Sequence, residues 1–251
     1  MLLLLLLSGC ATSTAASSVP SASAAPKTYS ATVLDDAPAA YWPMDEASGS
    51  IMTDATVDGN NGQYAGTYTL GQPGPHPGDA DTAVAFDGLS GSASVPNSTS
   101  LQMNTVTIEL WIKMRTDNEY GVYVAKNVEG GGGAGSSWFQ LLNNRHTGRL
   151  EFRVASDGDP AIISATTLAL NTWYYVVATY DGNVAKLFVN GTLDGSLTVV
   201  ATPKQTADPL FIGRRGDGLF NNVVLDDIAI YPTALSAARI AAHWRAASGT
   251  R

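Results

Sequence analysis

One stretch of the chain constrains the fold more than any other, because it has the pattern of three strands joined by two tight turns. Within residues 173–196 the runs WYYVVATY and NVAKLFV are separated by Asp181-Gly182, and the second run is followed by Asn190-Gly191. Asp-Gly and Asn-Gly pairs accept the positive backbone dihedrals that tight hairpin turns require. The pattern therefore predicts an antiparallel meander, which is typical of an all-β protein.

Further short apolar runs follow one another along the chain and are separated by turn residues. These strand candidates are residues 82–86, 105–114, 121–127, 137–142, 149–155, 209–213 and 222–231. Within residues 105–114 apolar and polar side chains alternate, which indicates one buried face and one partly hydrated face. A single helix is expected near the end, over residues 235–244, with Ser236 as its N-cap. We therefore expect an all-β, two-sheet antiparallel β-sandwich with a short C-terminal helix.

The composition supports one turn-rich β domain and argues against two kinds of partner. The chain has 251 residues with 25 Gly and 12 Pro, and only 14% of its residues are charged. Sandwiches of this length commonly form a single domain. The formal net charge is −8, and residues 1–26 contain no charged side chain. An acidic domain repels phosphate backbones and anionic headgroups, so we expect no binding to nucleic acid or directly to a membrane surface.

The N-terminal residues have the pattern of an export signal followed by a tether. Six consecutive leucines lead into Leu7-Ser8-Gly9-Cys10, which resembles the lipobox of bacterial lipoproteins. The run is too short to span a bilayer. We expect residues 1–10 to be a signal peptide with lipidation at Cys10, and residues 11–28, rich in Ala, Ser and Thr, to be a flexible linker. The folded domain would then be residues 29–251.

The expected location follows from that pattern. It is a secreted, membrane-anchored lipoprotein of a bacterial cell envelope, or alternatively a protein of a virion surface. The other interpretation of Cys10 is a free cysteine near a frayed terminus. Since the chain has one cysteine, it cannot form an internal disulfide framework.

Motifs spread over about residues 40–245 resemble, in order and spacing, the laminin-G-like jelly-roll domains of the concanavalin A-like lectin/glucanase superfamily. They include Tyr41-Trp42-Pro43-Met44-Asp45-Glu46, Phe86-Asp87-Gly88, Thr107-Ile108-Glu109-Leu110-Trp111-Ile112, the Asn171 to Gly182 stretch, and Leu225-Asp226-Asp227-Ile228-Ala229-Ile230-Tyr231. The resemblance implies a concanavalin A-like sandwich. It also implies one structural calcium ion at the sandwich edge.

The strand at residues 222–231 suggests where such an ion would bind. Strict alternation would place Asp226 on one face with Val224, Ile228 and Ile230, and a buried carboxylate must be paired or coordinate an ion. Oxygen ligands suit calcium. The expected ligands are Asp87 and Asp226, followed by Asp45 and Asp54. The alternative is that Asp226 only accepts hydrogen bonds from a neighbouring loop.

The acidic residues do not have the pattern of a glycoside hydrolase. Glucanases of this fold place two acids two residues apart on one strand, whereas Glu151 has Arg149 and Arg153 at those positions. The three histidines, His76, His146 and His243, are scattered and are expected to be ordinary surface or packing residues. We therefore expect no enzymatic activity and disfavour a glycoside hydrolase.

Two classes of function remain open. One is a surface-exposed carbohydrate-binding or adhesive module that recognises a glycan or a surface protein, with Trp111 and Trp138 as candidate ligand-binding residues. The other is a structural spacer, or a decoration protein on a cell or virion surface, that binds no glycan. Fold alone does not separate them, because loops carry the specificity.

Overall fold

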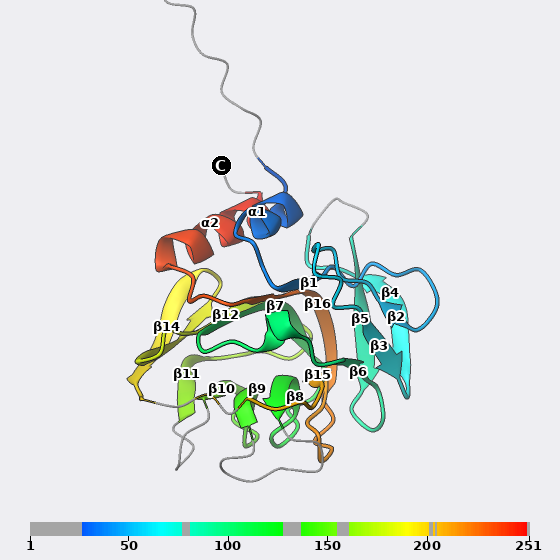
Figure 1. Cartoon of the computed structure of the whole chain (residues 1–251). Coiled ribbons are helices and arrows are strands. Elements are labelled where there is room, and N and C mark those ends of the chain that lie inside the picture. Colours follow the sequence, from blue (N-terminus) through cyan, green and yellow to red (C-terminus); the bar gives the residue numbers. More distant parts are fainter. Residues whose placement is uncertain are drawn as a thin grey trace, which may run out of the picture.

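The protein is described from a computed structural model, which covers residues 27–76, 81–127, 137–154, 161–200, 203 and 205–249. Two eight-stranded antiparallel sheets lie face to face, and both helices lie on the outer side of one of them (Figure 1). This confirms the predicted β-sandwich. In the described part of the chain, no helix is both long and apolar enough to cross a bilayer.

Sheet A carries the helices. Its strands, in spatial order, are β14 (Thr192–Thr198), β13 (Val184–Val189), β12 (Trp173–Tyr180), β7 (Val106–Met114), β16 (Asn222–Tyr231), β5 (Thr82–Asp87) and β4 (Tyr68–Pro73), with β1 (Ala40–Trp42) paired to β16. The predicted meander forms β12, β13 and β14. At its second turn Asn190 and Gly191 adopt φ of 50° and 76°, as an Asn-Gly hairpin requires.

Sheet B forms the opposite layer. Its strands, in spatial order, are β11 (Ala161–Thr167), β10 (Arg149–Val154), β9 (Ser137–Asn144), β8 (Val122–Asn127), β15 (Leu210–Ile212), β6 (Ser92–Val95), β3 (Gly62–Ala65) and β2 (Ile51–Met52). A short 3-10 helix, η1 (Thr99–Leu101), lies between β6 and β7.

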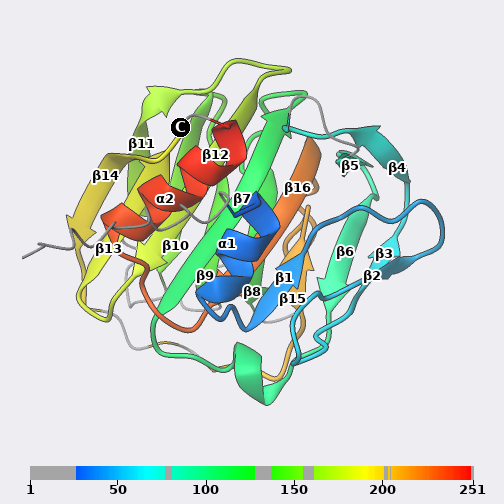
Figure 2. The same cartoon turned by 90° about the horizontal axis from the view of Figure 1, so that it is seen from above.

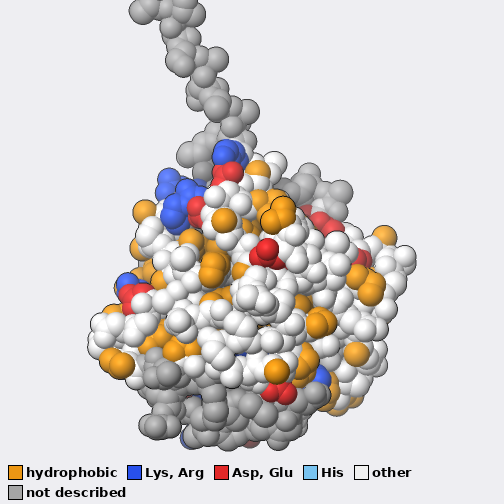
Figure 3. Space-filling model, in the orientation of Figure 1, with side chains coloured by type: hydrophobic (Ala, Val, Ile, Leu, Met, Phe, Trp, Pro, Cys, Tyr) orange, Lys and Arg blue, Asp and Glu red, His pale blue; other side chains and the backbone are white. Residues whose placement is uncertain are grey.

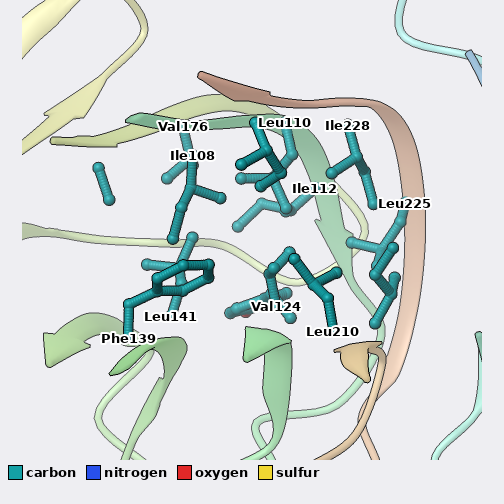
Figure 4. Close-up of a cluster of buried hydrophobic side chains, with 14 of the residues drawn as sticks. Ile108, Leu110, Ile112, Val124, Phe139, Leu141, Val176, Leu210, Leu225 and Ile228 are labelled. Carbon is teal, nitrogen blue, oxygen red and sulfur yellow. The ribbon is translucent and has the colours of Figure 1, made fainter. Parts of the chain in front are cut away.

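The main core fills the space between the sheets. Ile108, Leu110 and Ile112 of β7 point toward Phe139 and Leu141 of β9 (Figure 4), and all five are buried. Burial of such side chains is the main stabilising contribution in a sandwich, at roughly 1.5–3 kcal/mol each. The inner positions expected in residues 105–114 are therefore confirmed.

Two helices, α1 (Tyr29–Asp35) and α2 (Ala237–Ser248), cover the outer face of sheet A (Figure 2). The hydroxyl of Ser236 accepts a hydrogen bond from the backbone N–H of Arg239 at 3.3 Å, so the predicted cap is confirmed. The helix α1 was not predicted, and Thr28 caps it through the backbone N–H of Ala31. Because of these helices, the prediction of a partly hydrated face on β7 was wrong.

One buried carboxylate holds both helices against sheet A. Glu109 of β7 is inaccessible to solvent and accepts hydrogen bonds at 2.8 Å from the hydroxyls of Tyr29, Tyr175 and Tyr231. It also accepts one at 2.9 Å from Nδ1 of His243 on α2. The three tyrosines come from α1, β12 and β16. Four elements therefore meet at one charged group.

The same histidine continues the network toward the end of α1. Nε2 of His243 lies 2.9 Å from Oδ2 of Asp36, which also accepts a hydrogen bond at 2.8 Å from Nε of Arg239. Burial disfavours a charged imidazole, but the hydrogen bonds and negative charges of Glu109 and Asp36 outweigh it and raise the pKa of His243. Both ring nitrogens then donate to carboxylates, as an imidazolium can.

Candidate metal centre

A β-bulge in β16 decides where its two aspartates point. Asp226 pairs with Trp111 of β7, but the next paired residue on β16 is Ala229, opposite Glu109, so the register shifts between them. Asp227 lies in this irregularity with φ of 50°. An extra residue in a strand reverses which face the following side chains occupy.

The bulge overturns the face assigned to Asp226 from simple alternation. Before it, Val223 and Leu225 enter the main core, and after it Ile228 and Ile230 do so. Asp226 therefore lies on the outer face of sheet A with Trp111, and not on the inner face with Ile228 and Ile230. It is nevertheless 0% exposed.

Asp226 has one satisfied oxygen and one unsatisfied oxygen. Its Oδ1 accepts a hydrogen bond at 3.0 Å from the backbone N–H of Asp227, while its buried Oδ2 has no hydrogen-bond partner in the described part of the chain. Asp81, just before β5, lies beside it. Asp45 lies at the exposed rim, where its Oδ1 accepts hydrogen bonds from the backbone N–H (2.8 Å) and hydroxyl (3.1 Å) of Thr82.

The crowding of these carboxylates is unfavourable without a counter-charge. Burial, followed by the charges of Asp227 and Asp81, raises the pKa of Asp226 well above its usual value. Burial and the charge of Asp227 raise the pKa of Asp81 to about 7, although His76 acts in the opposite direction. Like charges in one site disfavour ionisation of each other, and a bound cation removes that penalty.

His76 contacts the other side of the cluster. Its Nε2 lies 2.8 Å from Oδ2 of Asp227, and its ring packs against those of Tyr29 and Trp111 at centroid distances of 5.2 and 5.3 Å. The hydroxyl of Tyr41 donates to Oδ1 of Asp227. Burial raises the pKa of Asp227, and the hydrogen bonds from His76 and Tyr41 oppose that rise.

The cluster borders a cleft of about 380 Å³ between the helices. The cleft is lined by Thr28, Tyr29, Ser30, His76, Asp81, Asp227 and residues 246–249. The start of α1 and the end of α2 therefore form the walls beside the aspartates. An ion bound to Asp81 or Asp227 on this side would remain accessible to small molecules.

Two of the four expected calcium ligands lie outside this cluster. Asp87 pairs with Asn222, four positions before Asp226, which corresponds to roughly 13 Å along the strand. Burial opposes its ionisation, but the backbone N–H groups of Ser90, Gly91 and Leu89 outweigh that and lower the pKa of Asp87. Its carboxylate organises the turn after β5.

Asp54, like Asp87, organises a loop by accepting hydrogen bonds from backbone N–H groups. It accepts hydrogen bonds from the backbone N–H groups of Tyr41 at 2.9 Å, Thr56 at 2.9 Å and Asn60 at 2.7 Å. These donors occupy the positions that a cation would need. The structure thus brings together Asp45 and Asp226 of the predicted set, and adds Asp81, Asp227 and His76.

Asp45, Asp81 and Asp226 supply oxygen donors of the kind that a calcium ion uses, and the charge of Asp45 acts on both of the other two carboxyl groups. The fit rests on the buried Oδ2 of Asp226, which has no donor, and on the mutual repulsion of the three carboxylates. Oxygen-only sets of this kind suit a hard cation. The sequence gave no sign of Asp81, because it enters the cluster through the loop before β5 and not through a strand pattern.

The tryptophans predicted to bind a sugar are not available in this structure. Trp111 is 4% exposed beneath α1 and α2, where it packs against Tyr29, Tyr175 and Trp244. Trp138 is 0% exposed within the main core. Neither ring offers a face to a ligand, so these two assignments were wrong.

Comparison with known proteins agrees with the geometry described above. Residues 86–241 match the laminin G type model described as the concanavalin A-like lectin/glucanases superfamily. The chain belongs to this superfamily. A search of curated proteins gave no match.

Solved structures of other proteins share this fold at low sequence identity. Domain 4 of AbnA, an extracellular GH43 arabinanase from Geobacillus stearothermophilus, solved with arabinotriose, is 15% identical with a TM-score of 0.64, covering 82% of this chain and 97% of that domain. The receptor binding domain of a botulinum neurotoxin C/D mosaic serotype is 15% identical with a TM-score of 0.64, and the match covers 84% of this chain and 51% of that one. The binding domain of botulinum neurotoxin DC in complex with SialylT is 14% identical with a TM-score of 0.62, and the match covers 86% of this chain and 53% of that one.

This concanavalin A-like chain therefore spans about half the length of the toxin binding domains that it matches. It covers nearly all of the arabinanase domain. Two of these neighbours are toxin binding domains, and the likeness to all three is one of fold.

The outer face of sheet B carries the aromatic and polar groups that the tryptophans do not supply. Tyr120, which precedes β8, is half-buried, and the guanidinium groups of Arg145 and Arg153 each lie 5.6 Å from its ring centroid. Arg145 also donates to the Tyr120 hydroxyl. We call Tyr120, Arg145 and Arg153 the tyrosine–arginine patch.

Buried polar side chains lie beside this patch. Gln140 of β9 pairs with Arg153 of β10, and its side-chain oxygen accepts a hydrogen bond at 3.4 Å from Arg215. Arg215 forms a two-point contact with Asp217, with N···O distances of 2.6 and 2.8 Å. None of these residues was predicted to bind a ligand, because Tyr120, Arg145 and Arg215 lie in connections between strands, where alternation gives no signal.

Proposed function

We propose that the protein is a non-catalytic carbohydrate-binding module and that it binds glycan at the tyrosine–arginine patch of sheet B. The observation that carries this proposal is a half-buried tyrosine ring with two guanidinium groups over it, on the sheet opposite the helices. Aromatic rings stack on sugars, and guanidinium groups donate to their hydroxyl or carboxylate oxygens. The glycan-bound state of the arabinanase domain supports this kind of ligand.

The hydrogen bonds of Glu109 and Glu151, the two glutamates on strands, support the absence of catalysis. Glycoside hydrolysis needs one carboxyl group to act as an acid and another as a nucleophile or base. Glu109 accepts four hydrogen bonds beneath the helices, and Glu151 accepts hydrogen bonds from Asn144 and Arg153. Neither is disposed to exchange a proton with a bound sugar.

Calcium has a structural part in the proposal. Asp45, Asp81 and Asp226 would hold the ion at the edge of sheet A, where it would neutralise the crowded carboxylates. These residues come from the β1–β2 connection, the approach to β5, and the β16 bulge. Binding there would fix those three segments relative to one another.

Lipidation of Cys10 would place the module at a bacterial cell envelope. The described chain begins at Lys27, beside α1, and sheet B lies on the other side of the sandwich (Figure 1). This helix-bearing end, over which Lys and Arg side chains gather, is at the top of Figure 3. An anchor attached there would leave the tyrosine–arginine patch facing outward.

A glycan array followed by calorimetry tests the proposal. The purified protein is applied to the array, and binding of the best glycan is compared between the unmodified protein, Tyr120→Ala and the control Tyr68→Ala. Tyr68 is a half-buried tyrosine on β4 of the other sheet. We expect Tyr120→Ala to weaken binding at least about tenfold, or about 1.4 kcal/mol, and Tyr68→Ala to leave it unchanged. An array with no retained glycan would favour the structural spacer instead.

A further inference from the structure

The nitrogen of His76 gives one end of the aspartate cluster a different chemistry from the calcium-type end. Nε2 of His76, a carboxylate oxygen of Asp81 and one of Asp227 all lie within 4.8 Å of one another. Nε2 is 2.8 Å from Oδ2 of Asp227 and 3.8 Å from Oδ2 of Asp81. A mixed nitrogen and oxygen set suits borderline divalent cations such as Zn²⁺ better than calcium.

These separations are close to what coordination requires. Metal–ligand bonds of about 2.0–2.2 Å in a tetrahedral site place neighbouring donor atoms roughly 3.3–3.5 Å apart. The His76–Asp227 separation of 2.8 Å is shorter than this by about 0.5 Å, and the His76–Asp81 separation of 3.8 Å is longer by about 0.3 Å. A small rotation of the His76 ring or the Asp81 carboxylate therefore suffices to form the site.

A second observation points to a cation at the same place. The side chain of Asp226 is fully buried, its Oδ2 has no hydrogen-bond partner in the described part of the structure, and it lies beside Asp81. A buried carboxylate oxygen without a donor either takes up a proton or is stabilised by a positive charge nearby, and a bound cation supplies that charge. His76 and Tyr29 also have fixed positions, because their rings pack against each other and against Trp111.

We propose that His76, Asp81 and Asp227 form a binding site for one borderline divalent cation of the Zn²⁺ type, with an open coordination position that faces the cleft between α1 and α2. The ion accepts the Nε2 lone pair, so the Nε2 proton is released and the ring keeps its Nδ1 proton. Tyr41 holds Asp227 in place through its hydroxyl. This site is independent of the glycan surface, which lies on the other sheet.

The proposal also assigns two cations to two overlapping sets of ligands. Asp81 belongs to both, whereas Asp45 serves only the calcium-type set and His76 only the Zn²⁺-type set. Substitutions at Asp45 and His76 should therefore separate the two ions. Loss of Asp81 should weaken both.

Binding of Zn²⁺ and Co²⁺ to the metal-stripped protein tests the site. Calorimetry with Zn²⁺ should give one site per chain, and Co²⁺ should give the intense visible absorption of a four-coordinate ion. We expect His76→Gln and Asp81→Asn to weaken Zn²⁺ binding at least about tenfold. Asp45→Asn should weaken Zn²⁺ binding far less than His76→Gln, because Asp45 acts on Asp81 only through its charge. The matched control is His146→Gln, since that histidine has a 61% exposed side chain.

Circular dichroism of each metal-free variant shows whether it is folded. If His76→Gln is unfolded, Asp81→Asn provides the same comparison with a change of only one atom type. The proposal is overturned if the unmodified protein binds neither ion, or if folded His76→Gln binds Zn²⁺ as tightly as the unmodified protein. Equal loss in His146→Gln would also overturn it, because that result would mean adventitious binding to surface histidines.

Discussion

Replacing Glu109 by glutamine tests whether one buried charge holds both helices on sheet A. The substitution keeps the size of the side chain but removes the charge that faces His243 and accepts hydrogen bonds from Tyr29, Tyr175 and Tyr231. Breaking a buried ion pair by removing one partner costs about 3–5 kcal/mol. For a protein of this size that loss lowers the melting temperature by roughly 6–20 °C.

The pH dependence of the folding stability is a second test of the Glu109–His243 pair. Since the folded protein raises the pKa of His243, the pair stabilises the fold fully below the unfolded histidine pKa of about 6.5. That contribution is lost as the pH rises from there through the higher folded pKa. Glu109→Gln removes the larger of the two influences that raise the pKa of His243 and leaves only Asp36, so the stability of the variant should depend less on pH in this window.

Urea unfolding followed by tryptophan fluorescence at pH 5.5 and pH 9 measures both effects. The fluorescence of Trp111 and Trp244 should report it, since their rings lie 5.6 Å apart beneath and within α2. Glu119→Gln is the control, because that side chain is 57% exposed. A loss below about 1 kcal/mol in Glu109→Gln, or an unchanged pH dependence, would refute a central role for this carboxylate.

Three further outcomes are expected. Calcium at about 100 times its dissociation constant should stabilise the protein by about 2.7 kcal/mol relative to chelator in thermal unfolding. Asp226→Asn should abolish that difference and should raise the stability of the metal-free form. Equal melting temperatures of the unmodified protein in both conditions would contradict the calcium site. Cys10→Ala should move the protein from the membrane to the soluble fraction of cells, so an unchanged distribution would exclude the lipid anchor. The purified protein should release no reducing sugar from β-glucans, and turnover lost in Glu151→Gln would reverse that expectation.

The local strand and turn signals were strong enough to predict most of the fold. Residues 222–231 form β16 with the expected bounds, and the Asn190-Gly191 pair makes the expected hairpin. These features depend on alternation and turn chemistry over a few neighbouring residues. The C-terminal helix was predicted for the same reason, because Ser236 and the apolar residues after it lie close together in the sequence.

The site could be predicted only in part, because it depends on contacts between distant segments. The bulge at Asp227 reverses the face of Asp226, and nothing in an uninterrupted run of strand-forming residues marks its position. Trp111 was predicted to be available because no pattern in residues 29–35 indicated the helix α1 that covers it. Asp81 and His76 reach the cluster through a Pro- and Gly-rich connection, whose path alternation does not determine.

The side-by-side placement of the two helices has a consequence for how this domain can be connected to other chains. Thr28 at the start of α1 and Gly249 at the end of α2 border the same cleft, so the two ends of the described domain are close in space. A domain with neighbouring ends can be inserted into a surface loop of a host protein without stretching that loop. The same geometry permits a circular permutant in which a short Gly-Ser bridge joins the ends and new termini open in an exposed turn such as Asp181-Gly182. Both sheets would keep their strand order in either arrangement.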